Sequence, residues 1–328
     1  MEFESADTLT TYDYSFDPNS ATNRLLKADV WELPYWGGEN SFIYLRNEDH
    51  AVQDLRGYHI DIGWGNYTTS NEYSTQARVW VESQRYSTSP GKQYVALKML
   101  TMYDILNMIP YTGGSAPDYK YTYTSTTVYD ILEDLIETYT PFTLDAIGSV
   151  DDGIITTLEP TFVVNDMGVQ YWESIGQAVY RLLGITKLYL KAKTGLAFEL
   201  VYPQEADAVD ETYEAPLEPV TGKHAFYSYT ENYSLVLPNS VKVFGNQSSD
   251  GTWGSVVTGE WDDTGEQSRF MTIADFYPFG SLTAEADLDN QASAHGAREL
   301  AEMKSGVGII PHDCRIELYD KPVFLDGR

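Results

Sequence analysis

The sequence has one cysteine, Cys314, in 328 residues, so an internal disulfide is excluded. Positive charge is also scarce, because 21 Lys and Arg stand against 49 Asp and Glu and give a net charge of −28. A chain this acidic repels DNA and RNA, and it contains no basic cluster long enough to bind either. No apolar run approaches the roughly 20 residues that span a bilayer as a helix. These absences argue against a disulfide scaffold, a nucleic-acid-binding protein and a helical membrane protein.

The N-terminal residues 1–17 are acidic and polar, which is unlike a secretory signal. We therefore expect a soluble protein that is made in the cytoplasm and is not exported by a signal peptide. The acidity also fits a protein that works in high salt, where self-repulsion is screened. Composition alone leaves open whether the acidity reflects a saline habitat or a functional acidic surface.

Motifs that identify common enzyme classes are missing. The sequence contains no GxSxG, GxGxxG or GxxxxGK[ST], which removes support for a nucleophile elbow, a dinucleotide site and a phosphate loop. Five histidines are present, and none forms HExxH or another metal-ligand spacing: His50, His59, His224, His295 and His312. We therefore predict no enzyme activity, no catalytic, cofactor-binding or metal-binding residues, and no cofactor.

Four acidic or thiol motifs were weighed as sites. Glu260-Trp261-Asp262-Asp263 places carboxylates beside an aromatic, as in sugar-active sites, but a solvated loop is favoured because acidic residues are abundant. Asp151-Asp152-Gly153 is typical of a turn. Asp287-Leu288-Asp289-Asn290 lacks the spaced ligands of a calcium loop and fits the acidic start of a helix. His312-Asp313-Cys314 has no second histidine nearby, which disfavours a catalytic thiol.

The residues that are abundant indicate a globular, β-rich protein. Hydrophobic residues make up 42% of the chain, and it contains 26 tyrosines. Tyrosine suits both wet strand surfaces and protein interfaces, so its abundance does not separate a binding role from simple β-richness. A length of 328 residues is enough for two or three domains.

The stretch with the clearest pattern of secondary structure lies between Pro160 and Pro203. Residues 161–164 predict a strand, and apolar residues from Trp172 to Leu183 recur at helical spacing before Gly184, so we assign Trp172 to a core. Residues 187–193 and 197–202 predict a strand pair around Thr194-Gly195. One strand face carries lysines that either dock an acidic neighbour or are solvated: Lys187, Lys191 and Lys193. Together with an amphipathic helix at 128–137, this stretch predicts an α+β domain over 109–205.

The flanking regions are rich in short alternating segments. Segments at 41–45, 57–63, 77–83 and 94–100 predict strands, followed by a short helix at 100–108. Later segments at 225–230, 240–245, 255–260, 269–273, 314–319 and 321–325 predict more strands, and an Ala-rich run at 287–304 predicts a helix.

These segments give a four-part division of the chain. We expect an N-terminal arm at 1–28, a barrel-like β domain at 29–108, the α+β domain at 109–205, and a second barrel-like β domain at 206–328 that contains the helix near 287–304. The predicted fold class is α+β and β-rich, with two small barrel-like β domains flanking a helix-on-sheet domain.

The order of these segments resembles the central hub proteins of phage tails and baseplates, the late-control D-like family. The stretches that carry the resemblance are patterned rather than motif-like and cover most of 40–328: 42–65, 94–109, 127–139, 171–200, 237–246, 292–306 and 316–328.

The resemblance implies a virion structural protein, assembled in the host cytoplasm, that connects the tail tube to the distal tip or baseplate. It also implies a ring, typically a trimer, in which two similar barrels in each subunit match a hexameric tube. DNA then passes through the lumen without specific binding, and an acidic wall suits this passage. No membrane is implied as a partner. The expected ring contacts are the sheet surfaces of both barrels, including strand 240–245.

Two alternatives remain open. One is a polysaccharide-active enzyme or tail-associated cell-wall hydrolase that uses Glu260, Asp262 or Asp263. The other is a carbohydrate-binding β module.

Overall fold

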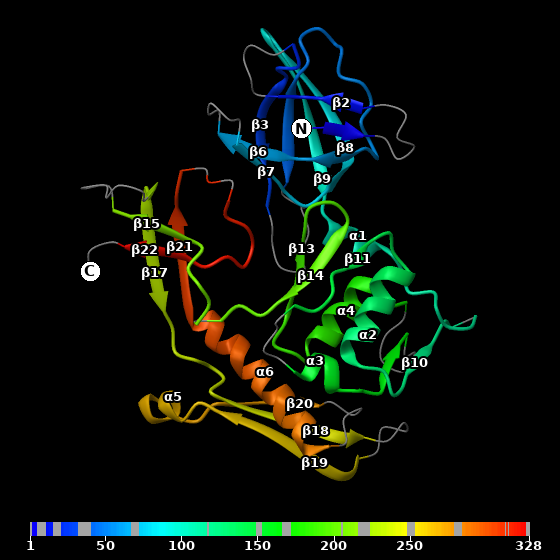
Figure 1. The fold of residues 1–328 in the computed structure, drawn as a ribbon, viewed down its shortest axis with the longest axis vertical. Coiled ribbons are helices and arrows are strands. Elements are labelled where there is room, and N and C mark those ends of the chain that lie inside the picture. The colour runs from blue at the N-terminus through cyan, green and yellow to red at the C-terminus, as the bar shows by residue number, and fades with distance from the viewer. Residues whose placement is uncertain are drawn as a thin grey trace.

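The computed structural model describes residues 2–4, 11–15, 21–31, 41–66, 72–116, 118–148, 153–165, 172–204, 206–215, 224–247, 253–278, 284–311, 313 and 315–325. The fold class is the predicted one, a β-rich α+β arrangement (Figure 1). In Figure 1 the N-terminal strands lie at the top, the helices of the middle region at the right, and the C-terminal elements at the left and bottom.

The N-terminal region is a seven-stranded sheet with the order β2-β1-β5-β8-β9-β4-β3. Its strands are β1 (Glu2–Glu4), β2 (Thr11–Asp13), β3 (Leu25–Asp29), β4 (Phe42–Arg46), β5 (His59–Asp61), β8 (Val79–Ser89) and β9 (Lys92–Leu100). A separate hairpin joins β6 (Gly63–Asn66) to β7 (Glu72–Thr75). Alternating apolar residues of the sheet are buried on one face, as a half-buried sheet requires: Ile43, Leu45, Ile60, Val79, Val81, Val95, Leu97 and Met99.

The sheet curls so that its two outer strands approach each other. The Leu25 N–H, at the start of β3, donates to the Ser15 carbonyl, two residues beyond β2, at 3.2 Å. The structure therefore differs from the arm predicted for 1–28, because β1, β2 and β3 are strands of this sheet. The polar residues that indicated an arm lie in strands that pair within this sheet.

The middle region contains the helices α1 (Met102–Met108), α2 (Val128–Glu133), α3 (Ile154–Thr157) and α4 (Ile175–Leu183), and α2 continues into a π-helical turn, η1 (Asp134–Thr138). Two small sheets accompany them. One pairs β10 (Tyr121–Tyr123) with β12 (Phe162–Val164), and the other has the order β11-β14-β13 and consists of β11 (Thr143–Leu144), β14 (Ala197–Val201) and β13 (Tyr189–Ala192). The predicted helices at 128–137 and 172–183 and the strand pair are confirmed in type.

Helix α4 begins later than its apolar spacing predicts. A capping box of Ser174 and Gln177 starts the helix, so Trp172 lies outside it with a positive φ of 55°. The Trp172 side chain is 57% exposed and packs on the Tyr119 ring with centroids 5.8 Å apart. The assignment of Trp172 to a core was wrong, because a periodic pattern does not mark where the capping residue interrupts it.

The C-terminal region forms three small sheets rather than one continuous sheet. Their orders are β16-β15-β22, β17-β21 and β19-β18-β20. The strands are β15 (Glu211–Glu214), β16 (His224–Ala225), β17 (Ser228–Tyr233), β18 (Ser240–Gln247), β19 (Trp253–Asp262), β20 (Ala274–Pro278), β21 (Lys304–Ile309) and β22 (Pro322–Leu325), with helices α5 (Thr264–Arg269) and α6 (Glu285–Met303).

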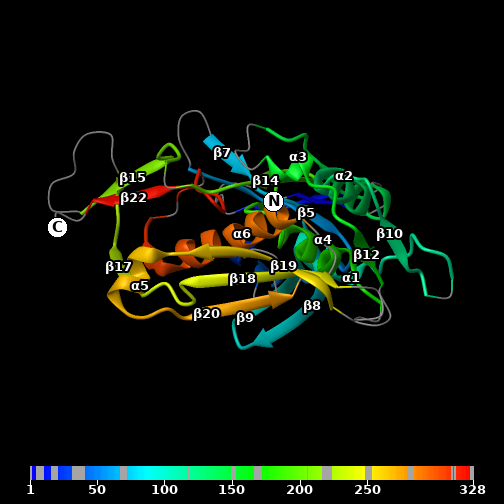
Figure 2. The ribbon, with the colours of Figure 1, turned by 90° about the horizontal axis from the view of Figure 1, so that it is seen from below.

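Helix α6 confirms the helix predicted near 287–304 and covers one face of the β18 sheet (Figure 2). Two glycines allow this close approach. A Cβ on Gly259 would lie 2.0 Å from the Leu288 backbone, and one on Gly296 would lie 2.1 Å from the Trp261 ring. Val241 and Leu288 are fully buried and belong to the same hydrophobic cluster as the middle region, so packing continues across the boundary predicted at 205/206.

Two predicted strands are absent at their expected positions. Residues 269–273 end α5 and lead into β20, which begins at Ala274. The described residues of 314–319 form turns rather than a strand. In the ranges that the structure describes, no helix has the length and apolar character needed to cross a membrane.

Helix α6 holds one histidine whose protonation opposes folding. The His295 ring stacks on Tyr277 with centroids 4.1 Å apart, and burial, together with the charge of Arg298, lowers the pKa of His295 to about 4, although Asp275 opposes this shift. The unfolded chain binds this proton near pH 6.5, whereas the folded chain does not until about pH 4.

The free energy of unfolding is therefore expected to fall by about 1–3 kcal/mol as pH is lowered from about 6.5 to about 4. His295→Gln should flatten this part of the stability curve, which urea unfolding at a series of pH values measures. An unchanged slope between these pH values would contradict the assignment.

Candidate functional site

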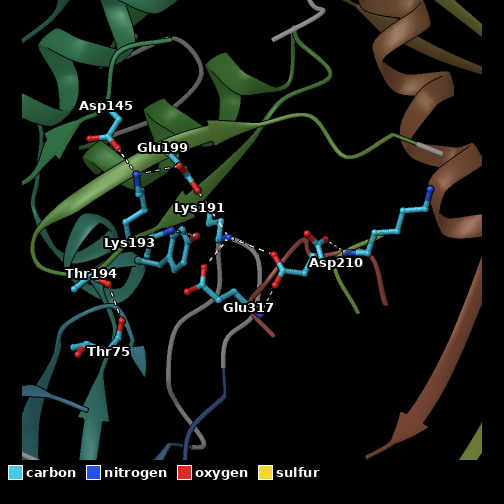
Figure 3. A network of polar contacts seen from close by, with 12 residues as sticks. Thr75, Asp145, Lys191, Lys193, Thr194, Glu199, Asp210 and Glu317 are labelled. Carbon is cyan, nitrogen blue, oxygen red and sulfur yellow. Dashed lines mark hydrogen bonds and ion pairs between the residues drawn. The ribbon is translucent and has the colours of Figure 1, made fainter. Parts of the chain in front are cut away.

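The hairpin formed by β13 and β14 lies where the three regions of the chain meet. Its register places Lys191 opposite Glu199, and Gly195 makes the turn with a φ of 83°. Alternation along β13 buries Leu190 in the middle region and turns Lys191 to the other face, as predicted. We call this hairpin, together with Thr75, Asp145 and the turn 317–320, the junction (Figure 3).

Lys191 is the central cation of the junction. Its side chain is only 12% exposed, and its Nζ lies 2.9 Å from a Glu317 carboxylate oxygen. Asp320 at 3.7 Å and Glu199 at 3.8 Å complete the surrounding carboxylates. Burial alone would lower the pKa of Lys191, but the hydrogen bond to Glu317 and the nearby negative charges together raise it above its ordinary value. Lys191 therefore remains charged and joins the middle region to the turn 317–320.

Lys193 repeats this arrangement at the edge of the junction. Its Nζ donates to Asp145, just after β11, at 2.6 Å, and pairs with Glu199 at 3.2 Å. These two hydrogen bonds raise the pKa of Lys193. Since Lys193 is 41% exposed, water and salt screen its pairs more than those of Lys191. Glu199 contacts both lysines and so links the two ion pairs.

The hairpin turn also contacts the N-terminal region. The Thr194 hydroxyl donates to the Thr75 carbonyl at 2.7 Å, and Ala77 forms bridges with Thr194 and Gly195. Nearby, the Trp80 ring packs edge-on against Phe142 with centroids 6.0 Å apart. The N-terminal region is therefore held to the middle region by backbone contacts of Thr75 and Ala77 and by the aromatic contact of Trp80.

Tyr103 of α1 hydrogen-bonds to β13 of the same hairpin. Its hydroxyl donates to the Leu190 carbonyl at 2.6 Å and accepts from the Ala192 N–H at 3.1 Å. Two small cavities of about 30 and 70 Å³ lie beside these contacts and share Gln76, Ala77 and Ala192 in their walls. Spaces of this size suit water molecules rather than a cofactor or substrate.

The turn 317–320 closes the junction from the C-terminal side. Tyr319 adopts a φ of 72°, which is uncommon for a residue other than glycine, and its ring packs on Tyr189 with centroids 5.2 Å apart. Leu318 lines the smaller cavity. The unusual backbone places an apolar and an aromatic side chain between the acids that bind Lys191.

Arg298 connects α6 to the end of α4. Its Nη2 donates to the Leu183 carbonyl at 2.8 Å and to the Thr186 carbonyl at 3.2 Å, and its guanidinium lies 5.6 Å from the centre of the Tyr189 ring. The Leu183 carbonyl at the end of α4 also accepts from the Thr186 N–H and hydroxyl at 3.0 Å each, so the cation from α6 adds a further donor at this helix end.

The lysine face predicted from the sequence is therefore engaged inside the chain. Lys191 and Lys193 pair with acids of this chain, and Lys187 lies 6.0 Å from the Tyr202 ring. The alternation of β13 revealed the lysines, but no local signal pointed to Glu317 or Asp320, which are more than 120 residues away in the sequence.

The carboxylates weighed as catalytic residues all have structural partners. Glu260 pairs with Lys242 at 2.6 Å, and the pair lies across β19 and β18. Asp262 accepts from Gln267 at 2.8 Å, and Asp263 caps α5 by accepting from the Glu266 N–H at 3.0 Å. The predicted solvated loop is a strand end and a helix cap, and each of the three carboxylates has a partner within the chain.

Among the described residues, one group has the composition of a metal site: Glu211, His224 and Asp313 offer ligand atoms within 4.8 Å of one another. Arg315 already binds the group, because it donates to Asp313 at 2.7 and 2.9 Å and pairs with Glu211. Its guanidinium holds the pKa of Asp313 well below its usual range. Arg315 therefore joins Asp313 and Glu211 in a network of ion pairs.

The remaining sequence candidates divide into two sets. Asp289 accepts from the Glu260 N–H at 2.9 Å and ties α6 to β19, which fits the structural role favoured for 287–290. Asp151, Asp152, His312 and Cys314 lie outside the residues that the structure describes.

Strand 240–245, expected in ring contacts, is the central strand β18. Its backbone pairs with β19 on one side and β20 on the other, and α6 covers one face. Only the outer face, where Phe244 stacks on Phe276 with centroids 5.8 Å apart, remains for another molecule.

The fold has counterparts among solved structures. The tail protein from Neisseria meningitidis MC58 matches 91% of this chain and 80% of its own length with a TM-score of 0.58 and 12% identity. The 43 kDa tail protein of prophage MuSo2 from Shewanella oneidensis matches 91% of this chain and 87% of its own with a TM-score of 0.50 and 10% identity.

A third counterpart is more distant. The prophage tail protein gp18 from Listeria monocytogenes EGD-e covers 98% of this chain and 84% of its own with a TM-score of 0.47 and 10% identity. No family model matches the sequence, and no curated protein is similar to it. At these identities the first two structures establish a shared fold.

The two lysines provide a matched test of the junction. Lys191→Met should lower the free energy of unfolding by about 1–3 kcal/mol, because Glu317 and Asp320 lose their cation and Glu199 keeps only Lys193. The same change at the more exposed Lys193 should cost less than about 1 kcal/mol. Urea unfolding followed by tryptophan fluorescence measures both. An equal decrease in the free energy of unfolding for the two variants would show that the burial of Lys191 does not make its ion pairs more stabilising than those of Lys193.

Proposed function

We propose that this chain is a structural component of a phage tail, a hub that connects the tail tube to the distal tip or baseplate. The observation that carries the proposal is the fold, which is shared over 91% of the chain with the Neisseria tail protein. In this proposal the chain assembles in the host cytoplasm into a ring, expected to be a trimer, and is incorporated at the tail end.

The contacts of the junction favour a structural role for this chain. Ion pairs, a backbone bridge and aromatic packing hold three regions of one chain around a single hairpin. A subunit that occupies a fixed place in a larger assembly needs its regions in a constant relation. The ion pairs, the backbone bridge and the aromatic packing of the junction hold the three regions in this way.

The charge of the chain also suits this role. A lumen through which DNA slides must not bind phosphate, and a net charge of −28 opposes such binding. In the proposal DNA is therefore a passing molecule, and the partners are other copies of this chain, the tail tube and the distal tail proteins.

Location in the particle tests the proposal directly. Antibodies raised against the purified chain are expected to label purified phage particles at the distal end of the tail tube, as seen by negative-stain electron microscopy. Pre-immune serum provides the control. Labelling of the head or along the whole tube, or none at all on disrupted particles, would contradict a hub.

A second measurement addresses the hydrolase alternative. We expect wild-type protein and Glu260→Gln to release equal, background amounts of reducing ends from cell-wall material, because Glu260 is paired with Lys242. Release by the wild type that Glu260→Gln abolishes would establish the enzyme instead. Binding to a glycan array would favour the carbohydrate-binding module.

A further inference from the structure

Positive charge gathers on the outer face of the N-terminal sheet. Strands β3, β4, β9 and β8 lie side by side in that order, and their register sets which side chains share the face away from the core. One row of directly opposed residues crosses all four strands: Lys27, Tyr44, Ala96 and Arg85. Directly opposed residues share a face, and so do residues two positions apart on a strand. The outer face therefore alternates with buried residues such as Leu45 and Val95.

All the charged residues of these four strands belong to this outer face. The cations are Lys27, Arg46, Arg85, Lys92 and Lys98, and the acids are Asp29 and Glu82. Five positive and two negative charges give the strands a local charge of +3, whereas the whole chain has 21 Lys and Arg against 49 Asp and Glu. The cations are spread over residues 27–98, so only the folded sheet brings them together.

Both acids of the face are engaged by neighbouring lysines. The Lys98 Nζ lies 2.6 Å from a Glu82 carboxylate oxygen, and Lys27 pairs with Asp29. The strands therefore have no further carboxylate to offer the other three cations.

These three cations are exposed to solvent. Among the residues that the structure describes, Arg46, Arg85 and Lys92 have no ion pair. Asp49 lies shortly after β4, but Arg24 already binds it through two hydrogen bonds. The face therefore presents three positive charges that are not neutralised within the described chain.

The β8–β9 hairpin carries two of them beyond the core. Burial along β9 begins only at Val95, and the residues of β8 from Glu82 onward are exposed or half-buried. Gly91 makes the turn with a φ of 74°. Figure 1 shows the hairpin reaching the top of the molecule, so Arg85 and Lys92 are accessible to a partner.

Aromatic rings lie between the cations. Tyr44 contacts Phe42 with ring centroids 6.4 Å apart and Tyr94 with centroids 6.0 Å apart, and all three side chains are half-buried. Arginine and aromatic residues are enriched where proteins bind one another. The face therefore combines positive charge with the composition of a protein interface.

A folded acidic protein fits this face better than DNA does. DNA carries one charge for about every 1.7 Å of its axis, so a bound duplex would also meet the acids elsewhere on a chain of net charge −28. The rings of Phe42, Tyr44 and Tyr94 are tilted by 34° and 54° to their neighbours, and they do not form a parallel series on which bases stack. A folded protein can place carboxylates against this face alone.

The net charge of the chain opposes an acidic partner mainly at long range. At about 0.1 M salt, exposed charges more than about 10 Å apart are largely screened, so the cations in direct contact dominate a docked complex. A second copy would bring a further net charge of −28, and a different protein of smaller net charge is repelled less. We propose that the outer face of β3, β4, β9 and β8 docks the acidic surface of a different tail protein, an inference that rests on the proposed hub.

Zero-length cross-linking in purified phage particles tests the face. A carbodiimide joins a lysine amine to a carboxylate that it contacts, and mass spectrometry identifies both peptides. Lys92 is expected to be joined to Asp or Glu residues of another tail protein. Lys191, which is 12% exposed and surrounded by acids of its own chain, should be joined only to those acids.

Charge reversal then measures the contact with the cross-linked protein in purified form. Arg85→Glu and, as an independent variant, Lys92→Glu should each raise the dissociation constant by about tenfold or more, because an attraction becomes a repulsion. Lys120→Glu makes the same change in net charge at an exposed residue of the middle region, and it should leave the affinity within about twofold. Wild-type affinity should fall as salt is raised, and far-UV circular dichroism confirms that each variant is folded.

Three results would overturn the inference. The first is the absence of any cross-link from Lys92 to another protein in particles where antibodies find the chain at the tail end, which would leave the hub proposal intact. The second is cross-linking to a second copy alone, which would assign the face to contact between copies. The third is an unchanged dissociation constant in both folded variants. Particles that lack the chain would instead contradict the hub, and this partner with it.

Discussion

A nearly buried ammonium group must be neutralised where it lies, and this requirement at Lys191 organises the molecule. The carboxylates that neutralise it come from Glu199 on the neighbouring strand and from Glu317 and Asp320 near the end of the chain. The C-terminal residues must therefore return to the middle of the structure. The N-terminal region reaches the same hairpin through Thr75 of β7, so all three regions contact one strand pair.

Local elements could be predicted from the sequence because their signals are local. The alternation of 187–193, the apolar spacing of 128–137 and the Ala-rich run before residue 304 each specify a strand or helix without reference to distant residues. Boundaries set by capping were less accessible, as Trp172 and α5 show. The contacts of the junction were not predictable, because the partner of Lys191 depends on how residues more than 120 positions apart are brought together.

The acidic residues have different structural roles at different places in the fold. Asp263 caps a helix, Asp145 and Glu199 hold Lys193, and Asp313 is bound by Arg315. From the sequence alone, the abundance of acidic residues indicates a saline habitat or a functional acidic surface, and Asp263 is a candidate catalytic group. In the structure many of them are acceptors for specific donors.

The contact between Arg298 and the end of α4 has a mechanical consequence. If α6 were displaced, the Thr186 carbonyl would lose this donor, at a cost of about 1–3 kcal/mol if it stayed buried and unsatisfied, whereas the Leu183 carbonyl would keep its bonds from the Thr186 N–H and hydroxyl. A displacement of α6 relative to α4 therefore costs free energy, so this one guanidinium couples the positions of two helices that lie more than 100 residues apart in the sequence.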